Sequence, residues 1–110
     1  MTLHVGLASG RWSALTLAEQ LANVGADVGR AIRAKAAGDE GRFGPALDRA
    51  LELLDLTMSD PRWAGSRLRE LARMREVVCD YLVGDNAYET TAEWLDGYFM
   101  SFALAARRDR

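Results

Sequence analysis

Apolar residues recur three and four positions apart in four stretches of the chain, a spacing that places them on one face of an α-helix. The stretches cover approximately residues 16–37, 45–59, 66–83 and 90–107. No segment of similar length alternates apolar and polar residues as a half-buried strand does. The pattern therefore predicts an all-α fold with four helices.

Residues that cap helices stand at the start of three of these stretches. Thr16 with Glu19 forms an S/T-x-x-E capping box, in which each side chain accepts a hydrogen bond from the other residue's backbone N–H. Thr90 with Glu93 repeats the motif before the fourth stretch. Ser66 is the expected cap of the third helix.

Helix-breaking residues separate the stretches. The segment "AAGDEG" ends the first, Pro45 suits the first turn of the second, and "SDPRWAGS" ends the second around Pro61. The predicted connections of about six to eight residues suit antiparallel neighbours. We therefore expect an up-down antiparallel four-helix bundle over residues 16–110, preceded by a short N-terminal lead segment, residues 1–15.

Length and composition fit one globular domain. The chain has 110 residues, 49% of them hydrophobic, which is enough for a core of its own. Its net charge of −2 leaves a nucleic-acid partner open without supporting one. Cys79 is the only cysteine, which excludes an intramolecular disulfide and fits a reducing compartment. Because the sequence has neither a secretory signal nor eighteen consecutive apolar residues, we expect a cytoplasmic protein without a membrane partner.

The first helix carries a stripe of small residues beside its aliphatic stripe. Glycine within a helix costs up to about 1 kcal/mol relative to alanine, so glycines here indicate a close neighbour. The aromatic residues of the fourth stretch can supply the bulk, and we interpret them as core residues. The small residues are Ala18, Ala22, Gly25 and Gly29, and the aromatic ones are Tyr88, Trp94, Tyr98, Phe99 and Phe102.

Three carboxylates share one edge of the second helix. Asp48, Glu52 and Asp55 are spaced by four and three residues and flank its apolar stripe. In the third helix, Arg75 is expected to project into the middle of the apolar stripe, where an unpaired charge costs several kcal/mol. We predict a buried structural ion pair between Arg75 and one of these acids, first of all Glu52. The alternative is that Arg75 extends outward to water.

The sequence contains few residues that could form a metal site or a catalytic site. His4 is the only histidine, so a di-iron or di-manganese site built from Glu-x-x-His motifs is excluded. The pair Glu52 and Asp55 resembles the Glu-x-x-Asp pair of magnesium-dependent all-α nucleotide pyrophosphohydrolases. The preceding helix offers only Glu19 and Asp27 where that family has a Glu-Glu-x-x-Glu motif. We therefore expect no cofactor and a non-enzymatic protein, with a hydrolase using Glu52 and Asp55 as metal ligands kept as the alternative.

Two helices carry apolar residues away from their main apolar stripe. Leu53 and Leu56 do so on the second helix, and Met100 and Leu104 on the fourth. Contiguous apolar patches mark interfaces, and a symmetric homo-oligomer is the commonest way to cover one. We expect these four residues to form the interface of a homo-oligomer, and a different protein partner remains open.

The stretches "LAEQLANVGADVGRAI" and "FGPALDRALELLDL" resemble a family of four-helix-bundle proteins in helix order and in their small-residue texture. This family includes ribosomal RNA intervening-sequence proteins and the accessory variability proteins of diversity-generating retroelements. The resemblance implies a ring-like homo-oligomer that acts as a non-enzymatic accessory subunit to a nucleic-acid-processing enzyme.

Overall fold

The computed structural model describes residues 10–108 and confirms the all-α fold for them. Four α-helices account for most of this part of the chain, which contains no strand. Two short 3-10 helices, η2 and η3, precede α1 and α3. The elements are η2 (Trp12–Ala14), α1 (Leu17–Ala37), α2 (Glu40–Met58), η3 (Pro61–Trp63), α3 (Ser66–Leu82) and α4 (Ala92–Arg108).

Both predicted ends of α1 are confirmed. The Thr16 side chain accepts from the backbone N–H of Glu19 at 3.1 Å, and the Glu19 carboxylate accepts from the Thr16 N–H at 2.9 Å. At the other end Gly38 adopts a left-handed conformation with φ of 67°, which only glycine enters without strain. Local chemistry thus determines the limits of this helix.

The prediction that α2 begins at Pro45 is wrong, because the helix starts at Glu40. Asp39 caps it by accepting from the backbone N–H of Arg42 at 3.2 Å, so Pro45 lies inside the helix. Proline in that position removes a backbone hydrogen bond to Gly41, and the exposure of Gly41 leaves its carbonyl access to water. Only two residues therefore connect α1 to α2, where a longer loop was expected.

Two other predicted caps are displaced by one residue. Gly65, with φ of 85°, occupies the cap position of α3, and no side-chain bond from Ser66 is involved. At α4 the hydroxyl of Thr91 accepts from the backbone N–H of Trp94 at 3.0 Å, a role assigned to Thr90 from the sequence. Thr90 instead exchanges two hydrogen bonds with the Asn86 amide in the preceding loop.

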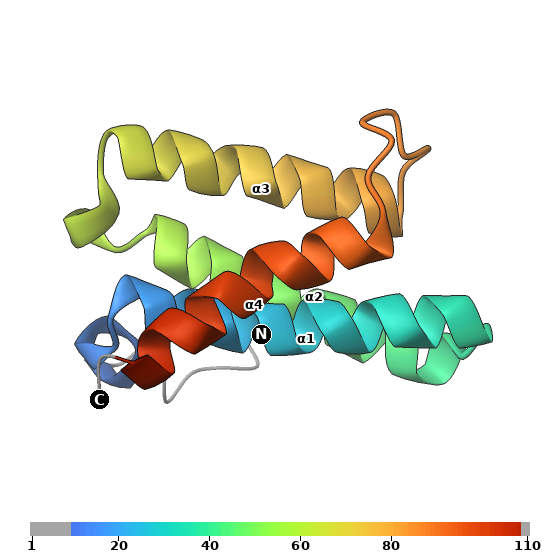
Figure 1. The fold of residues 1–110 in the computed structure, drawn as a ribbon, viewed down its shortest axis with the longest axis horizontal. Helices are drawn as coiled ribbons and strands as arrows, with labels where there is room; N and C mark the ends of the chain where they lie inside the picture. Colours follow the sequence, from blue (N-terminus) through green and yellow to red (C-terminus); the bar gives the residue numbers. More distant parts are fainter. Residues whose placement is uncertain (1–9, 109–110) are drawn as a thin grey trace.

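Helix α1 is the central element of the fold. It packs against α2 along most of its length and also against α4, while α3 packs mainly against α2. In Figure 1, α4 crosses obliquely in front of α1, and α3 lies along the top of the molecule. These contacts are compatible with a four-helix bundle whose fourth helix is tilted.

The close approach predicted for the small stripe of α1 is confirmed at Gly25. A Cβ atom at this position would collide with the side chain of Phe99 on α4. Phe99 is buried, but the interpretation of all the aromatic residues as core is wrong for Tyr88 and Trp94, which are more than half exposed. Tyr88 lies in the loop before α4 and Trp94 lies in the first turn of that helix.

The core face of α2 is rotated from its expected position. Leu53, predicted to lie on an outer face, is only 3% exposed and belongs to the core, while Leu56 packs against the core and is partly buried. The cause is that α2 contacts both α1 and α3, so a broader arc of its surface is covered. Its buried residues are Ala46, Ala50, Leu53, Leu54 and Thr57.

The described part of the lead segment also contributes to the core. Trp12, in η2, is buried and belongs to the same apolar cluster as the helices. Among the residues that the structure describes, no helix is long and apolar enough to cross a membrane.

Candidate functional site

The predicted ion pair of Arg75 forms with a different acid and at a different depth. The Arg75 Nε donates to Asp55 Oδ1 at 2.8 Å, and Nη2 lies 3.5 Å from Oδ2. The hydrogen bond that Arg75 donates to Asp55 raises the pKa of the Arg75 guanidinium. The side chains are 37% and 57% exposed, so the pair is not buried as expected, and its acid is Asp55, one of the three predicted candidates, in place of the first choice, Glu52.

Arg75 lies at the edge of the buried stripe of α3 because the stripe is centred elsewhere. Val77 is among the buried residues of α3. Its burial moves the centre of the stripe away from Arg75, and the guanidinium reaches Asp55 at the α2–α3 boundary. The buried residues of α3 are Leu71, Met74, Val77, Val78 and Leu82.

The alternative metal site gains no further ligands in the described part of the chain. Within residues 10–108, no group of three or more His, Cys, Asp or Glu side chains is placed to hold a metal ion. Asp55 is already engaged by Arg75. His4 lies outside the described residues, so the structure does not bear on its surroundings.

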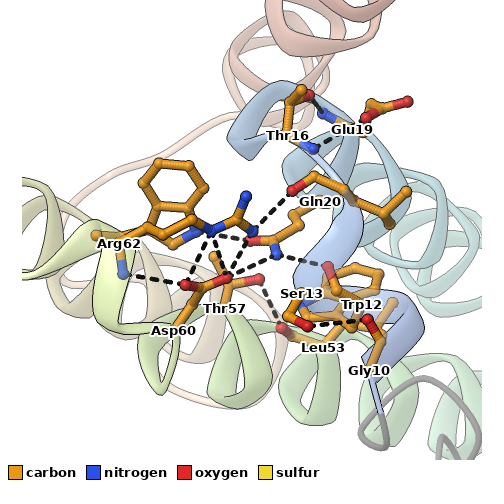
Figure 2. Close-up of polar contacts among 12 residues, drawn as sticks. Gly10, Trp12, Ser13, Thr16, Glu19, Gln20, Leu53, Thr57, Asp60 and Arg62 are labelled. Atoms are coloured by element: carbon orange, nitrogen blue, oxygen red, sulfur yellow. Dashed lines mark hydrogen bonds and ion pairs between the residues drawn. The ribbon is translucent and has the colours of Figure 1, made fainter.

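A buried polar cluster that we did not predict links the lead segment, α1 and the α2–α3 connection (Figure 2). Gln20 is completely buried, and its amide nitrogen donates to the carbonyl of Trp12 at 2.9 Å and to Asp60 Oδ2 at 3.2 Å. Its amide oxygen accepts from the indole N–H of Trp63 at 2.8 Å. We call this set, together with Arg62, the polar clasp.

Asp60 is the charged centre of the polar clasp. Its carboxylate accepts from the Arg62 guanidinium at 2.7 Å, from the Arg62 backbone N–H at 3.0 Å and from Gln20. The hydrogen bond from Arg62 is the main reason that the pKa of Asp60 falls from its ordinary value of 3.8 to about 2, although burial opposes the fall. Arg62 also donates to the carbonyl of Leu15 and covers the ring of Trp63. The clasp therefore holds the lead segment against the helices.

The only sequence signal for the clasp is a glutamine within the apolar pattern of α1. Gln20 stands next to Leu21, near the start of the aliphatic stripe. Two of its three partners, Asp60 and Trp63, lie forty or more residues away along the chain. The clasp is therefore a structural feature whose composition depends on the tertiary fold.

A second hydrogen bond between distant residues joins α3 to α4. The Tyr98 hydroxyl donates to Glu70 Oε1 at 2.9 Å. Burial of the ring, followed by the hydrogen bond to Glu70, raises the pKa of Tyr98. Tyr98 also stacks on the exposed Trp94, with ring centroids 5.7 Å apart. The hydrogen bond to Glu70 therefore links α4 to α3.

Two of the four residues predicted to form an interface are exposed on α4. Met100 and Leu104 are 52% and 53% exposed and stand one helical turn apart. We call them the apolar ridge. The other two residues predicted for the interface, Leu53 and Leu56, contribute to the core instead.

A groove of about 430 Å³ lies beside the apolar ridge, between α1 and α4. Small residues form much of its lining, and Phe99 and Met100 of the apolar ridge also contribute. The charged side chains at this groove are Asp96, Arg33 and Arg107. We call it the α1–α4 groove, and its small residues are Ala22, Gly25, Ala26, Gly29 and Ala103.

A larger groove, of about 640 Å³, lies between α1 and α2 and is strongly basic. Arginine side chains from both helices line it, and among the described residues Asp39 is the only acid in its lining. Its apolar lining within residues 10–108 consists of alanines and Pro45, without an aromatic ring. We call it the arginine groove, and its arginines are Arg30, Arg33, Arg42 and Arg49.

The chain matches no protein-family model, no curated protein and no solved structure.

Proposed function

We propose that this protein is a non-enzymatic helical interaction module that associates with copies of itself. The observation that carries the proposal is the apolar ridge of α4, which lies next to the α1–α4 groove on the same face. A self-complementary contact between two copies requires a protruding and a recessed surface side by side on the same face, and the apolar ridge and the groove meet this requirement. We propose the up-down bundle arrangement for its four helices.

The ridge has the size and chemistry to enter the groove of a second copy. Met100 and Leu104 are flexible or branched aliphatic side chains, and the small residues of the groove leave room for them. In a two-fold dimer, each copy's ridge fills the other's groove, so both exposed apolar surfaces are removed from water. No third protein is needed to cover them.

The charges at the α1–α4 groove also favour a second copy as the occupant. Asp96 is acidic, whereas Arg33 and Arg107 are basic, and all three line the same groove. A two-fold axis through this face brings the acid of each copy towards the bases of the other. Such complementarity improves the orientation and specificity of the contact more than its affinity.

Sedimentation equilibrium at micromolar concentration tests self-association. We expect a species of about twice the 12.1 kDa chain mass, and we expect Leu104→Glu to shift it towards the monomer. Val83→Glu is the matched control, because Val83 is similarly exposed but lies at the end of α3 and is not part of the apolar ridge. A wild-type protein that sediments as a single 12.1 kDa species would refute the proposal, as would equal dissociation by both variants.

We further propose that the module serves in the cytoplasm as an accessory subunit of a nucleic-acid-processing enzyme. This role rests on the resemblance to the ribosomal RNA intervening-sequence and retroelement accessory proteins, and the arginine groove supports it by offering a basic surface on a chain of net charge −2. Gene neighbourhood tests it. An adjacent reverse-transcriptase gene or a position within a ribosomal RNA gene supports the role. If the gene shows neither association in several genomes, the role is contradicted.

A further inference from the structure

The arginine groove carries a positive charge, in contrast to the net negative charge of the whole chain. Four guanidinium groups and one carboxylate line it, which gives the groove three more positive than negative charges, although the whole chain has a net charge of −2. A concave surface lined by one sign of charge concentrates the field and attracts ions of the opposite sign. The concentration of charge in this groove is therefore suited to an anionic ligand.

The tight α1–α2 turn is the reason that these arginines meet. Arg30 and Arg33 are one turn apart near the end of α1, and Arg42 and Arg49 are two turns apart near the start of α2. Because only Gly38 and Asp39 separate the helices, the two pairs line the same groove. The fold thus brings four guanidinium groups to one groove from separate positions in the sequence.

Two of the four guanidinium groups have no ion pair within residues 10–108. Arg30 pairs with Asp27 at 2.9 Å, and Arg42 lies 3.5 Å from Asp39, but Arg33 and Arg49 have no acidic partner in this range. The Arg30 and Arg42 side chains are also largely exposed, so their remaining N–H groups can donate to a ligand. The groove therefore keeps most of its donor capacity.

The composition of the groove identifies the class of ligand. The planar guanidinium fork matches the oxygens of a phosphate group in a bidentate manner. Arg42 and Arg49 are separated by about 10 Å along the helix axis, which is longer than a single phosphate group. The described residues contribute no aromatic ring to the lining of the groove, so they offer no stacking surface for a base.

We propose that the arginine groove binds a chain of phosphate groups through their oxygens, without reading bases. A nucleic-acid strand and inorganic polyphosphate present the same chemistry, and both are included in the test. The inference deepens the proposed accessory role but does not depend on self-association. Arg33 lines both grooves, whereas Arg42 and Arg49 line only the arginine groove, so the test uses the latter pair.

The experiment is a binding titration with a fluorescent single-stranded 20-mer and, separately, with inorganic polyphosphate, at low and at moderate salt. We expect Arg42→Gln/Arg49→Gln to weaken binding of at least one ligand by tenfold or more at low salt. Loss of two phosphate contacts should also reduce the slope of log affinity against log salt by about 1.4 for the strand. Binding of only one ligand supports the proposal and identifies the source of the phosphates.

Arg67→Gln/Arg69→Gln is the matched control, because it removes the same charge from an exposed part of α3 outside this groove. We expect it to change affinity by less than twofold. Equal weakening by both double variants would show general attraction and overturn the proposal, as would the absence of binding to either ligand at low salt. Sedimentation of Arg42→Gln/Arg49→Gln should match the wild type, which separates failure of this inference from failure of self-association.

Discussion

The polar clasp and the arginine groove use similar residues in opposite ways. In the clasp, Arg62 binds Asp60 through several hydrogen bonds, and Gln20 completes the shell of the carboxylate. In the arginine groove, four arginines line the same space as one acid, and Arg33 and Arg49 find no acid among the described residues. Both regions include α1, so the helix itself does not determine the difference.

The difference lies in burial and its consequences. Asp60 and Gln20 are buried, and a buried polar group without a partner costs about 1–3 kcal/mol, so the fold must satisfy them. The arginines of the groove retain water and need no partner for stability. Charges at the clasp therefore stabilise the fold, while charges at the groove remain available for binding.

The largest effect is expected from Asp60→Asn. Asparagine keeps the shape of the side chain but removes the charge that Arg62 binds, and a hydrogen bond to a charged group contributes about 1.5–3 kcal/mol. We expect a loss of about 2 kcal/mol in the free energy of unfolding, measured by urea denaturation. Asp48→Asn, at an exposed position on α2, is the control and should change it by less than about 0.5 kcal/mol. Equal effects of the two variants would mean that the clasp does not stabilise the protein.

A smaller effect, within a narrow pH range, should identify the Asp60 charge itself. Its pKa is about 2 in the folded state and 3.8 ordinarily, so the unfolded chain binds more protons between these values. The contribution of Asp60 to stability is therefore complete above about pH 4 and is lost as pH falls towards 2. Urea denaturation at several pH values should show that the difference between wild type and Asp60→Asn narrows over this range. A difference that stays constant from pH 5 to 2.5 would contradict the low pKa.

Local sequence signals predicted the elements of the fold more successfully than their contacts. The capping box of Thr16 and Glu19 and the left-handed Gly38 depend on residues within one or two turns, and both are confirmed. The small stripe of α1 also predicted a close neighbour, which Phe99 provides at Gly25. The caps depend on residues that are close in the sequence, and the close approach at Gly25 is visible in the sequence as a stripe of small residues.

The functional surfaces were harder to predict because they depend on distant residues. Placing the start of α2 at Pro45 left Arg42 in a loop, so the arginine groove could not be recognised from the sequence. Leu53 was assigned to an outer face because a helical wheel does not reveal how many neighbours cover a helix. The clasp joins Gln20 to Asp60 across forty residues, and no local pattern records that contact.

The ion pair between Arg75 and Asp55 lies between the two extremes and tests the role of burial most directly. Its 2.8 Å hydrogen bond has good geometry, yet both side chains are more than a third exposed, so water screens the pair. We expect Arg75→Met and Asp55→Asn each to change the free energy of unfolding by no more than about 1 kcal/mol, and to a similar extent.

The sequence-based model of a buried pair with Glu52 predicts a different order, in which Glu52→Leu is far more damaging than Arg75→Met because it strands a buried cation. Thermal or urea denaturation of the three single variants and of the double variant Arg75→Met/Asp55→Asn, which completes the cycle, distinguishes these models. A coupling energy of about 1 kcal/mol or less would place this pair with the exposed arginines of the groove, whereas a value near that of the polar clasp would show that exposure does not determine which charges stabilise this fold.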